Sequence, residues 1–576
     1  MTRRFEARRL LQLRTMAFHS ALLLLLFVLV AACAGQPKPE TRPAEHGLSP
    51  ILNYISSGWS RLTRSMTNCE SVADPKLAAK PILYLPAHFP EPAAVAEMRK
   101  KCNVRVESLP VAISGPGQVT ANISPPGLLY LEHDYVVPGG RFNEMYGWDS
   151  YFILRGLVES GKLSLARGVV ENFFFEIDRY GTILNANRTY YLTRSQPPFL
   201  SSMILAIYEA EKAAGHEDKA WLAKGYEHAT RNYAMWDREP HLAGDTGLAR
   251  YYDFGDGPAP ESLQDESGIQ RKVAMYFLLH SEGRAYVVDL SDTTSKTSSI
   301  GPEYNVLVCD DGEQKECETR KIGLTSEYYK GDRAMRESGF DISFRFGPYG
   351  AATHHYAPVC LNSLLYKAET DLERISNILG HREEAQQWQM RAAARKDRIQ
   401  KYLWDQQRGL FFDYNLDTRA RSTYEYATTF YPLWAGVATQ EQAQAVVKSL
   451  PLFEHPGGLA MSNQEHGVQW DLPYGWAPVQ LLAVEGLRRY GFDADANRIS
   501  YHFLSMVARN FRHDGTIREK YNVITGSSES RIEAGYKQNV VGFGWTNAAF
   551  LVLLHELPQN WVSRLEKEVN ADTPEN

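Results

Sequence analysis

Residues 361–403 read LNSLLYKAETDLERISNILGHREEAQQWQMRAAARKDRIQKYL. Apolar residues recur here at helical spacing in two runs separated only by Gly380 and His381, so the stretch predicts two successive helices. Similar runs cover residues 150–160, 200–214, 220–236, 440–450, 477–490 and 495–511. Aromatic, glycine-rich loops join them without a strand-helix-strand rhythm. We therefore predict an all-α protein, a helical toroid rather than a doubly wound sheet.

One region departs from the helical pattern. Residues 285–290 (AYVVDL) and 304–309 (YNVLVC) are β-type runs among Ser, Thr, Gly and Asp. We expect residues 269–329 to form a β-hairpin insertion in a loop of the helical domain. Such an insertion could cover an active site or decorate the surface.

The composition is that of a soluble globular protein. Of 576 residues, 44% are hydrophobic. The formal net charge is -6, and no long basic run follows the first residues, so the charge distribution gives no support for nucleic-acid binding. The 11 Trp and 32 Tyr suit sugar-stacking surfaces but are also ordinary core residues. We expect a monomer with an N-terminal extension (66–129), one large helical domain (130–560) and a short tail (561–576).

The N-terminus has the layout of a secretory signal. Five arginines precede an apolar run over residues 21–32, which is shorter than the run that a transmembrane helix usually needs. The run ends in Val-Ala-Ala-Cys33, which resembles the bacterial lipobox and implies a lipid on Cys33 after removal of residues 1–32. We expect residues 33–65 to be a flexible tether and the protein to face the periplasm from the cell envelope, at the outer membrane. A plain cleaved signal or an uncleaved anchor is the alternative.

Export would allow disulfides among the five remaining cysteines. Cys309 and Cys317 bracket an Asp-Asp-Gly turn signal and are the best candidate pair; Cys69 with Cys102 is a plausible second.

The residues that suggest chemistry begin at 138–151, PGGRFNEMYGWDSY. Two glycines permit a tight turn, after which Arg141, Glu144, Trp148 and Asp149 present charge and aromatic area just before a helix. Arginine donates to sugar hydroxyls, aspartate accepts from them, and tryptophan stacks on a pyranose. The pattern fits a carbohydrate pocket, although a structural loop with an internal Arg–Asp pair would look similar.

This string closely resembles the first signature of the trehalase family of glycoside hydrolases. The second signature is echoed by residues 469–478 (QWDLPYGWAP), and residues 184–199 (LNANRTYYLTRSQPPF) and 542–547 (GFGWTN) resemble further family blocks in the same order. The resemblance implies an (α/α)6 toroid that hydrolyses α,α-trehalose without a cofactor.

Hydrolysis of a glycoside requires two carboxyl groups at one anomeric carbon. By the family pattern, the general acid falls on Asp341 in residues 337–345 (ESGFDISFR), and the base falls on Glu519 in residues 518–522 (REKYN). Apolar Phe340 and Ile342 could help Asp341 keep its proton. Without the family, Asp341 could equally cap a helix or pair with Arg345, and Glu519 beside Lys520 would resemble a solvated surface pair.

The resemblance also implies a set of sugar-binding residues. Trp470 and Trp476 in this set would wall the pocket, although either could belong to the core. The full set is Arg141, Trp148, Asp149, Asn185, Arg194, Ser195, Gln196, Glu261, Gly339, Trp470 and Trp476.

Three departures from the family pattern affect the expected pocket. Ala259 stands where the family has an arginine, Phe340 and Tyr474 replace a Trp and an Asn, and Glu533 is only a shifted match to a glutamate in a Gly-rich run. They leave the acid and base in place but raise the alternatives of another α-glucoside as substrate, or of an inactive sugar-binding envelope protein.

Metal and nucleotide chemistry have little support. His354 and His355 are adjacent, but no Cys or carboxylate cluster stands at ligand spacing nearby, so we expect no metal site. No P-loop or dinucleotide fingerprint opens a strand–helix unit.

Overall fold

The computed structural model describes residues 47–72, 80–119, 123–265, 267–291, 298–309, 317–535 and 538–571. The predicted signal peptide and Cys33 lie outside these residues. From Ile51 onward the described chain forms one compact unit. No described helix combines the length and the apolar character needed to cross a membrane.

The centre of this unit is a closed ring of helices, as predicted. Each member packs against the next, and the last packs against the first. The ring consists of α5 (Gly147–Glu159), α7 (Leu200–Ala213), α12 (Val359–Leu379), α14 (Tyr431–Ala435), α16 (Ala477–Arg489) and α18 (Gly544–Glu556). Because ring helices have neighbours on both sides, they are buried over most of their surface. In α18, for example, nearly every residue from Gly544 to Leu553 is buried.

A second set of helices covers the ring. Most of them pack on at least one ring helix next to them in the chain, whereas α15 (Gln440–Lys448) packs mainly on β11 (Leu410–Phe411) and η7 (Leu450–Leu452). These helices are α6 (Leu163–Arg179), α8 (Lys219–Trp236), α13 (Arg382–Tyr402), α15 (Gln440–Lys448) and α17 (Asp493–Asp514), with α19 (Gln559–Ala571) packed on α17. The alternation of inner and outer helices is the predicted (α/α)6 toroid.

Residues 49–62, expected to be tether, form helix α2 (Ser49–Leu62). The spacing of Ile51, Ile55, Trp59 and Leu62 places them on one face, and all four are buried. The helix was missed because Ser, Gly and Asn separate these apolar residues.

The N-terminal extension contains a small parallel sheet in the order β3-β2-β4. Its strands are β2 (Ile82–Leu85), β3 (Arg105–Ser108) and β4 (Leu128–Leu129), with α4 (Ala93–Lys101) between the first two. The disulfide between Cys69 and Cys102 joins the end of α4 to α3 (Cys69–Val72), as the sequence suggested.

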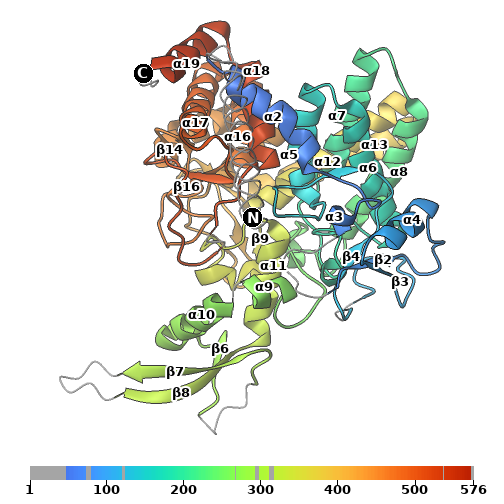
Figure 1. The fold of residues 1–576 in the computed structure, drawn as a ribbon. Coiled ribbons are helices and arrows are strands. Elements are labelled where there is room, and N and C mark those ends of the chain that lie inside the picture. Colours follow the sequence, from blue (N-terminus) through green and yellow to red (C-terminus); the bar gives the residue numbers. More distant parts are fainter. Residues whose placement is uncertain are drawn as a thin grey trace, which may run out of the picture. The chain divides into compact units, whose positions relative to one another are not determined.

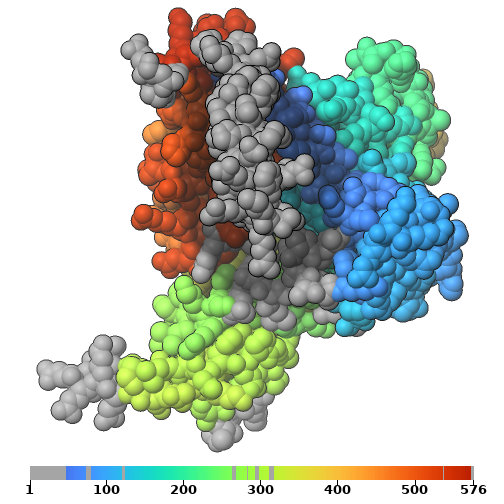
Figure 2. All heavy atoms as spheres, in the orientation of Figure 1, coloured from blue at the N-terminus to red at the C-terminus, as the bar shows by residue number. Residues whose placement is uncertain are grey.

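The insertion is part helix and part sheet. Helix α10 (Ser267–Leu279) precedes an antiparallel sheet in the order β6-β8-β7, formed by β6 (Val287–Asp289), β7 (Glu303–Cys309) and β8 (Cys317–Leu324). The predicted β-hairpin is therefore only the second part of residues 269–329, because Ile269, Val273 and Phe277 pack at helical spacing. Cys309 pairs with Cys317 across the β7–β8 ladder, as predicted. Strands β7 and β8 project from the helical body (Figures 1 and 2).

Candidate active site

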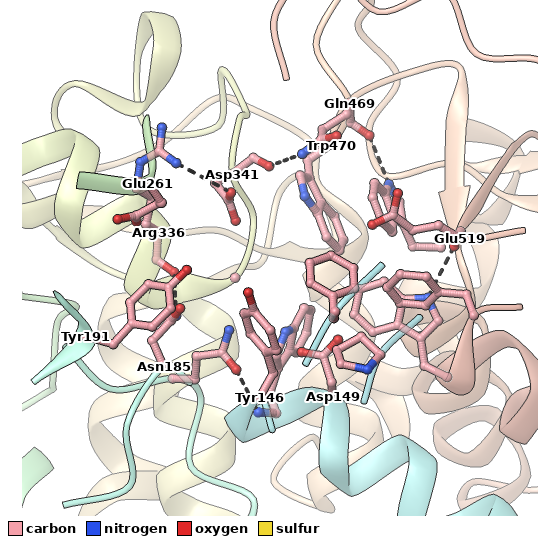
Figure 3. Close-up of a pocket in the computed structure, with 18 of the residues that line it drawn as sticks. Tyr146, Asp149, Asn185, Tyr191, Glu261, Arg336, Asp341, Gln469, Trp470 and Glu519 are labelled. Carbon is pink, nitrogen blue, oxygen red and sulfur yellow. Dashed lines mark hydrogen bonds and ion pairs between the residues drawn. The ribbon is translucent and has the colours of Figure 1, made fainter. Parts of the chain in front are cut away.

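A cavity opens at the end of the ring where the ring helices begin. It encloses about 590 Å³ of empty space, which includes some open solvent. Asp341 and Glu519 lie on opposite sides of it in Figure 3, with Asp149 between them. The lining residues are Pro138, Phe142, Tyr146, Trp148, Asp149, Asn185, Tyr191, Arg194, Gln196, Glu261, Arg336, Gly339, Asp341, Gln469, Trp470, Trp476, Glu519, Phe543 and Trp545.

Asp341 reaches the cavity from the segment after helix α11 (Ser326–Ser338). Gly339 ends this helix with a φ of 78°, a conformation that glycine adopts without steric cost. The Asp341 side chain is 18% exposed, and one of its carboxylate oxygens lies 3.9 Å from Arg336 Nη1. Gln469 donates to the Asp341 carbonyl. Arg345, the alternative partner, pairs instead with Asp413 at 2.6 Å.

Glu519 lies in a buried ion pair rather than on the surface. The residue is 6% exposed, and Lys520 Nζ, which is fully buried, lies 2.7 Å from its Oε2. The same ammonium stands 5.0 Å from the centre of the Trp476 ring. Trp545 Nε1 donates to the Glu519 carbonyl at 3.2 Å. Glu519 is thus held by a buried lysine and by Trp545, which lines the cavity.

Asp149, in the first turn of α5, has an unusual environment. Burial raises its pKa well above the ordinary aspartate value, and the negative charges of Glu519 and Asp341 raise it further. The three carboxyl groups therefore share one electrostatic environment. Burial and the two neighbouring carboxylates favour the neutral form of Asp149.

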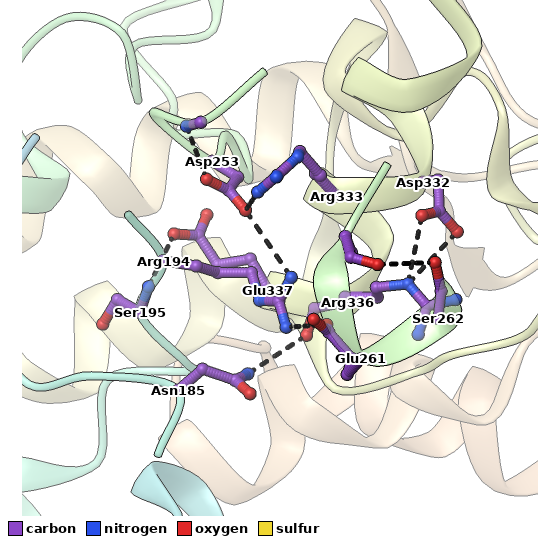
Figure 4. A network of polar contacts seen from close by, with 12 residues as sticks. Asn185, Arg194, Ser195, Asp253, Glu261, Ser262, Asp332, Arg333, Arg336 and Glu337 are labelled. Atoms are coloured by element: carbon purple, nitrogen blue, oxygen red, sulfur yellow. Dashed lines mark hydrogen bonds and ion pairs between the residues drawn. The ribbon is translucent and has the colours of Figure 1, made fainter. Parts of the chain in front are cut away.

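Arginine and carboxylate side chains form a network on the Asp341 side of the cavity (Figure 4). Arg194 pairs with Glu261 and lies 3.5 Å from Asp253. Burial opposes ionisation of Glu261, but Arg194 and Arg336 outweigh it and hold the pKa of this carboxyl below its usual value. Among the described residues, Arg194 Nε and Glu261 Oε2 are buried without a hydrogen-bond partner.

Four tryptophans form the apolar part of the wall. Trp470 and Trp476 stack with centroids 3.8 Å apart and planes 5° from parallel. Trp148 and Trp545 meet this stack at centroid distances of 5.9 and 5.7 Å. Trp470 and Trp476 are both nearly inaccessible to solvent, so they serve the core and the cavity together.

Two predicted sugar-binding residues are not among those that line the cavity. Ser195 is buried, with its hydroxyl donating to the Ile183 carbonyl at 2.7 Å and its N–H donating to Glu337 at 3.2 Å. Its role in the structure is to hold the loop that carries Arg194 and Gln196. The Arg141 guanidinium lies 4.8 Å from the Phe142 ring centre, beside the cavity.

The departures from the family pattern also lie outside the lining. Phe340 is 1% exposed and packs between Trp148 and Trp470, with centroids 5.5 and 5.1 Å away. The Tyr474 hydroxyl accepts the Arg531 N–H at 2.8 Å. Ala259 is fully buried, whereas Glu533 is exposed. None of these four residues therefore lines the cavity.

Several lining residues were not predicted from the sequence. Arg336 is the most important, because it places a guanidinium beside Asp341. It lies just outside the quoted residues 337–345, and no local pattern shows which side of α11 faces the cavity. The other missed residues all lie inside the quoted motifs: Pro138, Phe142, Tyr146, Tyr191, Gln469, Phe543 and Trp545.

The trehalase family model matches residues 93–558 of the chain. The cytosolic neutral trehalase of Saccharomyces cerevisiae is 37% identical, with 89% of this chain and 72% of that protein covered. A probable trehalase of Eremothecium gossypii is also 37% identical, with coverage of 89% and 73%. The solved structure of neutral trehalase Nth1 from Saccharomyces cerevisiae superposes with a TM-score of 0.72 at 32% identity, covering 91% of this chain and 96% of that one.

These relatives contradict the predicted location. The envelope assignment depended on the N-terminal residues alone, whereas relatives matching about nine-tenths of the chain are named cytosolic neutral trehalases. The prediction of a periplasm-facing envelope protein is therefore wrong. An arginine-rich, apolar N-terminus is a short compositional pattern, and it is weaker support than similarity along the whole chain.

Proposed function

The chain belongs to the trehalase family, and from this premise we propose how it cleaves α,α-trehalose into two glucose molecules: Asp341 is the general acid and Glu519 the general base of an inverting hydrolysis. The supporting observation is that both carboxyl groups line one cavity, on opposite sides of it. An inverting enzyme needs this arrangement because acid and attacking water approach the anomeric carbon from opposite faces.

In the proposed reaction, Asp341 gives its proton to the bridging oxygen as the glycosidic bond breaks. Glu519 removes a proton from a water molecule, whose oxygen forms the new bond to the anomeric carbon. The attacked glucose leaves as the β anomer and the other as the α anomer. Arg336, 3.9 Å from Asp341, stabilises the carboxylate that remains after donation.

The rest of the lining binds the sugars. We assign the Arg194–Glu261 pair to hydroxyl groups because each partner keeps a buried polar atom free among the described residues. Asp149 in its neutral form can donate as well as accept a hydrogen bond. Arg336 supplies a guanidinium to a cavity that lacks the family arginine at Ala259. The tryptophans pack against the apolar faces of the rings.

The test compares Asp341→Asn and Glu519→Gln with Glu176→Gln. Glu176 is a fully buried carboxyl outside the cavity lining, and burial raises its pKa, so glutamine resembles its neutral form. We expect kcat on trehalose to fall about 10²- to 10⁴-fold in the first two variants. Tm should be nearly unchanged in Asp341→Asn, whereas Glu519→Gln leaves the buried Lys520 without its ionic partner and should lower Tm, so its kcat is measured well below that Tm. Glu176→Gln should keep kcat.

Two results would contradict the mechanism. A Glu519→Gln enzyme that keeps the wild-type kcat would show that Glu519 is not the general base. Fresh products that contain only α-glucose by NMR would exclude inversion. A wild-type protein that binds trehalose without turnover would instead favour the inactive sugar-binding alternative.

A further inference from the structure

Two histidines that the sequence analysis set aside lie next to carboxylates in the fold. His354 and His355 belong to the short helix η5 (Thr353–His355). Glu327, in the first turn of α11, reaches both rings with one carboxylate oxygen: Oε1 lies 3.0 Å from His354 Nε2 and 2.6 Å from His355 Nε2. One potential ligand atom from each residue fits within a group less than 4.8 Å across. Two ring nitrogens and a carboxylate oxygen therefore converge on one point.

We propose that Glu327, His354 and His355 bind one divalent cation of the zinc class. Imidazole nitrogen with carboxylate oxygen is a donor set that suits Zn²⁺ and its neighbours Co²⁺ and Ni²⁺, whereas Mg²⁺ and Ca²⁺ prefer oxygen ligands alone. Three protein ligands leave a fourth position for water. The side chain of His354 is 5% exposed, that of His355 26% and that of Glu327 39%, so the ligands are held on one side and open to solvent on the other.

A fourth residue, Asp417, is placed to support the His355 ring. Asp417 Oδ2 lies 3.0 Å from His355 Nδ1, the ring nitrogen away from Glu327. Metal-binding histidines usually donate this second N–H to a carboxylate or carbonyl, which fixes the tautomer and the ring orientation. Asp417 thus presents the Nε2 lone pair of His355 toward the proposed cation.

The backbone brings these groups together without any help from a cation. Strand β9 (Tyr356–Ala357) pairs with β12 (Tyr414–Asn415), and the Leu416 N–H donates to the His355 carbonyl at 2.8 Å. This pairing carries Asp417 to His355. Arg250 holds the other side of η5 by donating to the His354 carbonyl at 3.2 Å.

Gly331 allows helix α11 to approach η5 closely. It lies one turn after Glu327 on the same face of the helix, and a Cβ there would stand 1.8 Å from the Ala351 carbonyl oxygen. Only glycine fits at this distance. A bound cation would therefore join two segments that the fold already holds in register, the start of α11 and η5, with Asp417 after β12 supporting His355.

The experiment uses the whole purified protein, freed of metal with EDTA. ZnCl₂ is titrated by calorimetry, and CoCl₂ is added separately because Co²⁺ absorbs visible light when bound by nitrogen and oxygen ligands. We expect one Zn²⁺ per chain, a higher Tm with Zn²⁺, visible Co²⁺ bands, and no binding of Mg²⁺ or Ca²⁺ under the same conditions.

Variants assign the site. Glu327→Gln and His355→Gln should each weaken Zn²⁺ binding at least tenfold, and Asp417→Asn about 10- to 100-fold. His513→Gln removes a histidine that is 90% exposed elsewhere on the chain, and it should bind Zn²⁺ like the wild type. Zn²⁺ binding of wild-type strength in the Glu327→Gln, His355→Gln double variant would overturn the proposal. So would wild-type protein that shows neither saturable Zn²⁺ binding nor Co²⁺ bands, a result that depends on no variant folding.

Discussion

Gly339→Ala tests whether the end of helix α11 shapes the cavity. Gly339 has a φ of 78°, lies two residues before Asp341, and itself lines the cavity. A Cβ at this position would stand 2.8 Å from Cε2 of Trp148, a buried ring of the aromatic wall. The substitution therefore adds a methyl group to a conformation that favours glycine and to a space that is already filled.

The structure offers a matched control at Gly380, which ends helix α12 in the same way with a φ of 84°. A Cβ at Gly380 would meet nothing within 4 Å. Left-handed strain costs about 1–2 kcal/mol for a residue with a side chain, and it applies to both glycines. Overpacking against Trp148 adds about 1–3 kcal/mol at Gly339 alone. We expect Gly339→Ala to lower the free energy of unfolding by about 2–5 kcal/mol in all, and Gly380→Ala by about 1–2 kcal/mol.

The two variants should separate more clearly in activity. If the methyl group displaces Trp148 or Asp341 by about 1 Å, kcat/KM on trehalose should fall by about 100-fold. Gly380→Ala should keep the wild-type kcat/KM. Urea unfolding gives the stabilities and initial rates give kcat/KM. A Gly339→Ala enzyme with wild-type kcat/KM, destabilised no more than Gly380→Ala, would refute the role of this contact.

Three further predictions concern the same wall. Because burial raises the pKa of Asp149, the folded chain keeps this proton when the unfolded chain has lost it, so the folded state loses stability as pH rises above the unfolded value of about 3.9. Asp149→Asn should therefore gain stability relative to wild type as pH rises, by about 1.36 kcal/mol for each pKa unit of the upward shift. The free energies of unfolding in urea measure this gain, and a difference between variant and wild type that does not change with pH would contradict it. Lys520→Met leaves Glu519 buried without its partner and should lower the free energy of unfolding in urea by about 3–5 kcal/mol. The control is Lys100→Met: the Lys100 side chain is 69% exposed in its pair with Glu97, so its loss should change the free energy of unfolding by less than about 1 kcal/mol. Phe340→Trp, which restores the family residue, should cost about 1–3 kcal/mol because Phe340 is packed on several sides by aromatic rings; a thermal melt that rises instead would show spare volume there.

The sequence predicted those parts of the fold that repeat. Helices α12 and α13 follow from the apolar period of residues 361–403 and from the glycine that ends the first of them. Helix α14 was missed because it has only five residues, and its place in the ring depends on contacts with α12 and α16 rather than on a local pattern. Helix α10 was missed because strong β-type runs follow it in the same insertion.

The candidate site was predicted where its residues lie in continuous motifs. The strings at residues 138–151, 184–199 and 469–478 each supply several lining residues. Arg336 and Glu327, a ligand of the proposed metal site, could not be found in this way. Their roles depend on which side of α11 faces the cavity and which side faces η5. Tertiary packing decides both, and adjacency in the sequence does not reveal it.

The closed ring also explains why chemistry gathers at one end of it. The sides of the ring helices are occupied by neighbouring helices, so polar groups can reach a cavity only from the loops and the first turns. The first N–H groups of a helix need acceptors, and the residue before α5, Tyr146, offers no side-chain cap. Gln196 fills this role from the next loop, accepting the Trp148 N–H at 2.9 Å while it lines the cavity. The same side chains thus complete the helix ends and form the cavity wall, so ring closure and the geometry around Asp341 and Glu519 depend on one set of contacts.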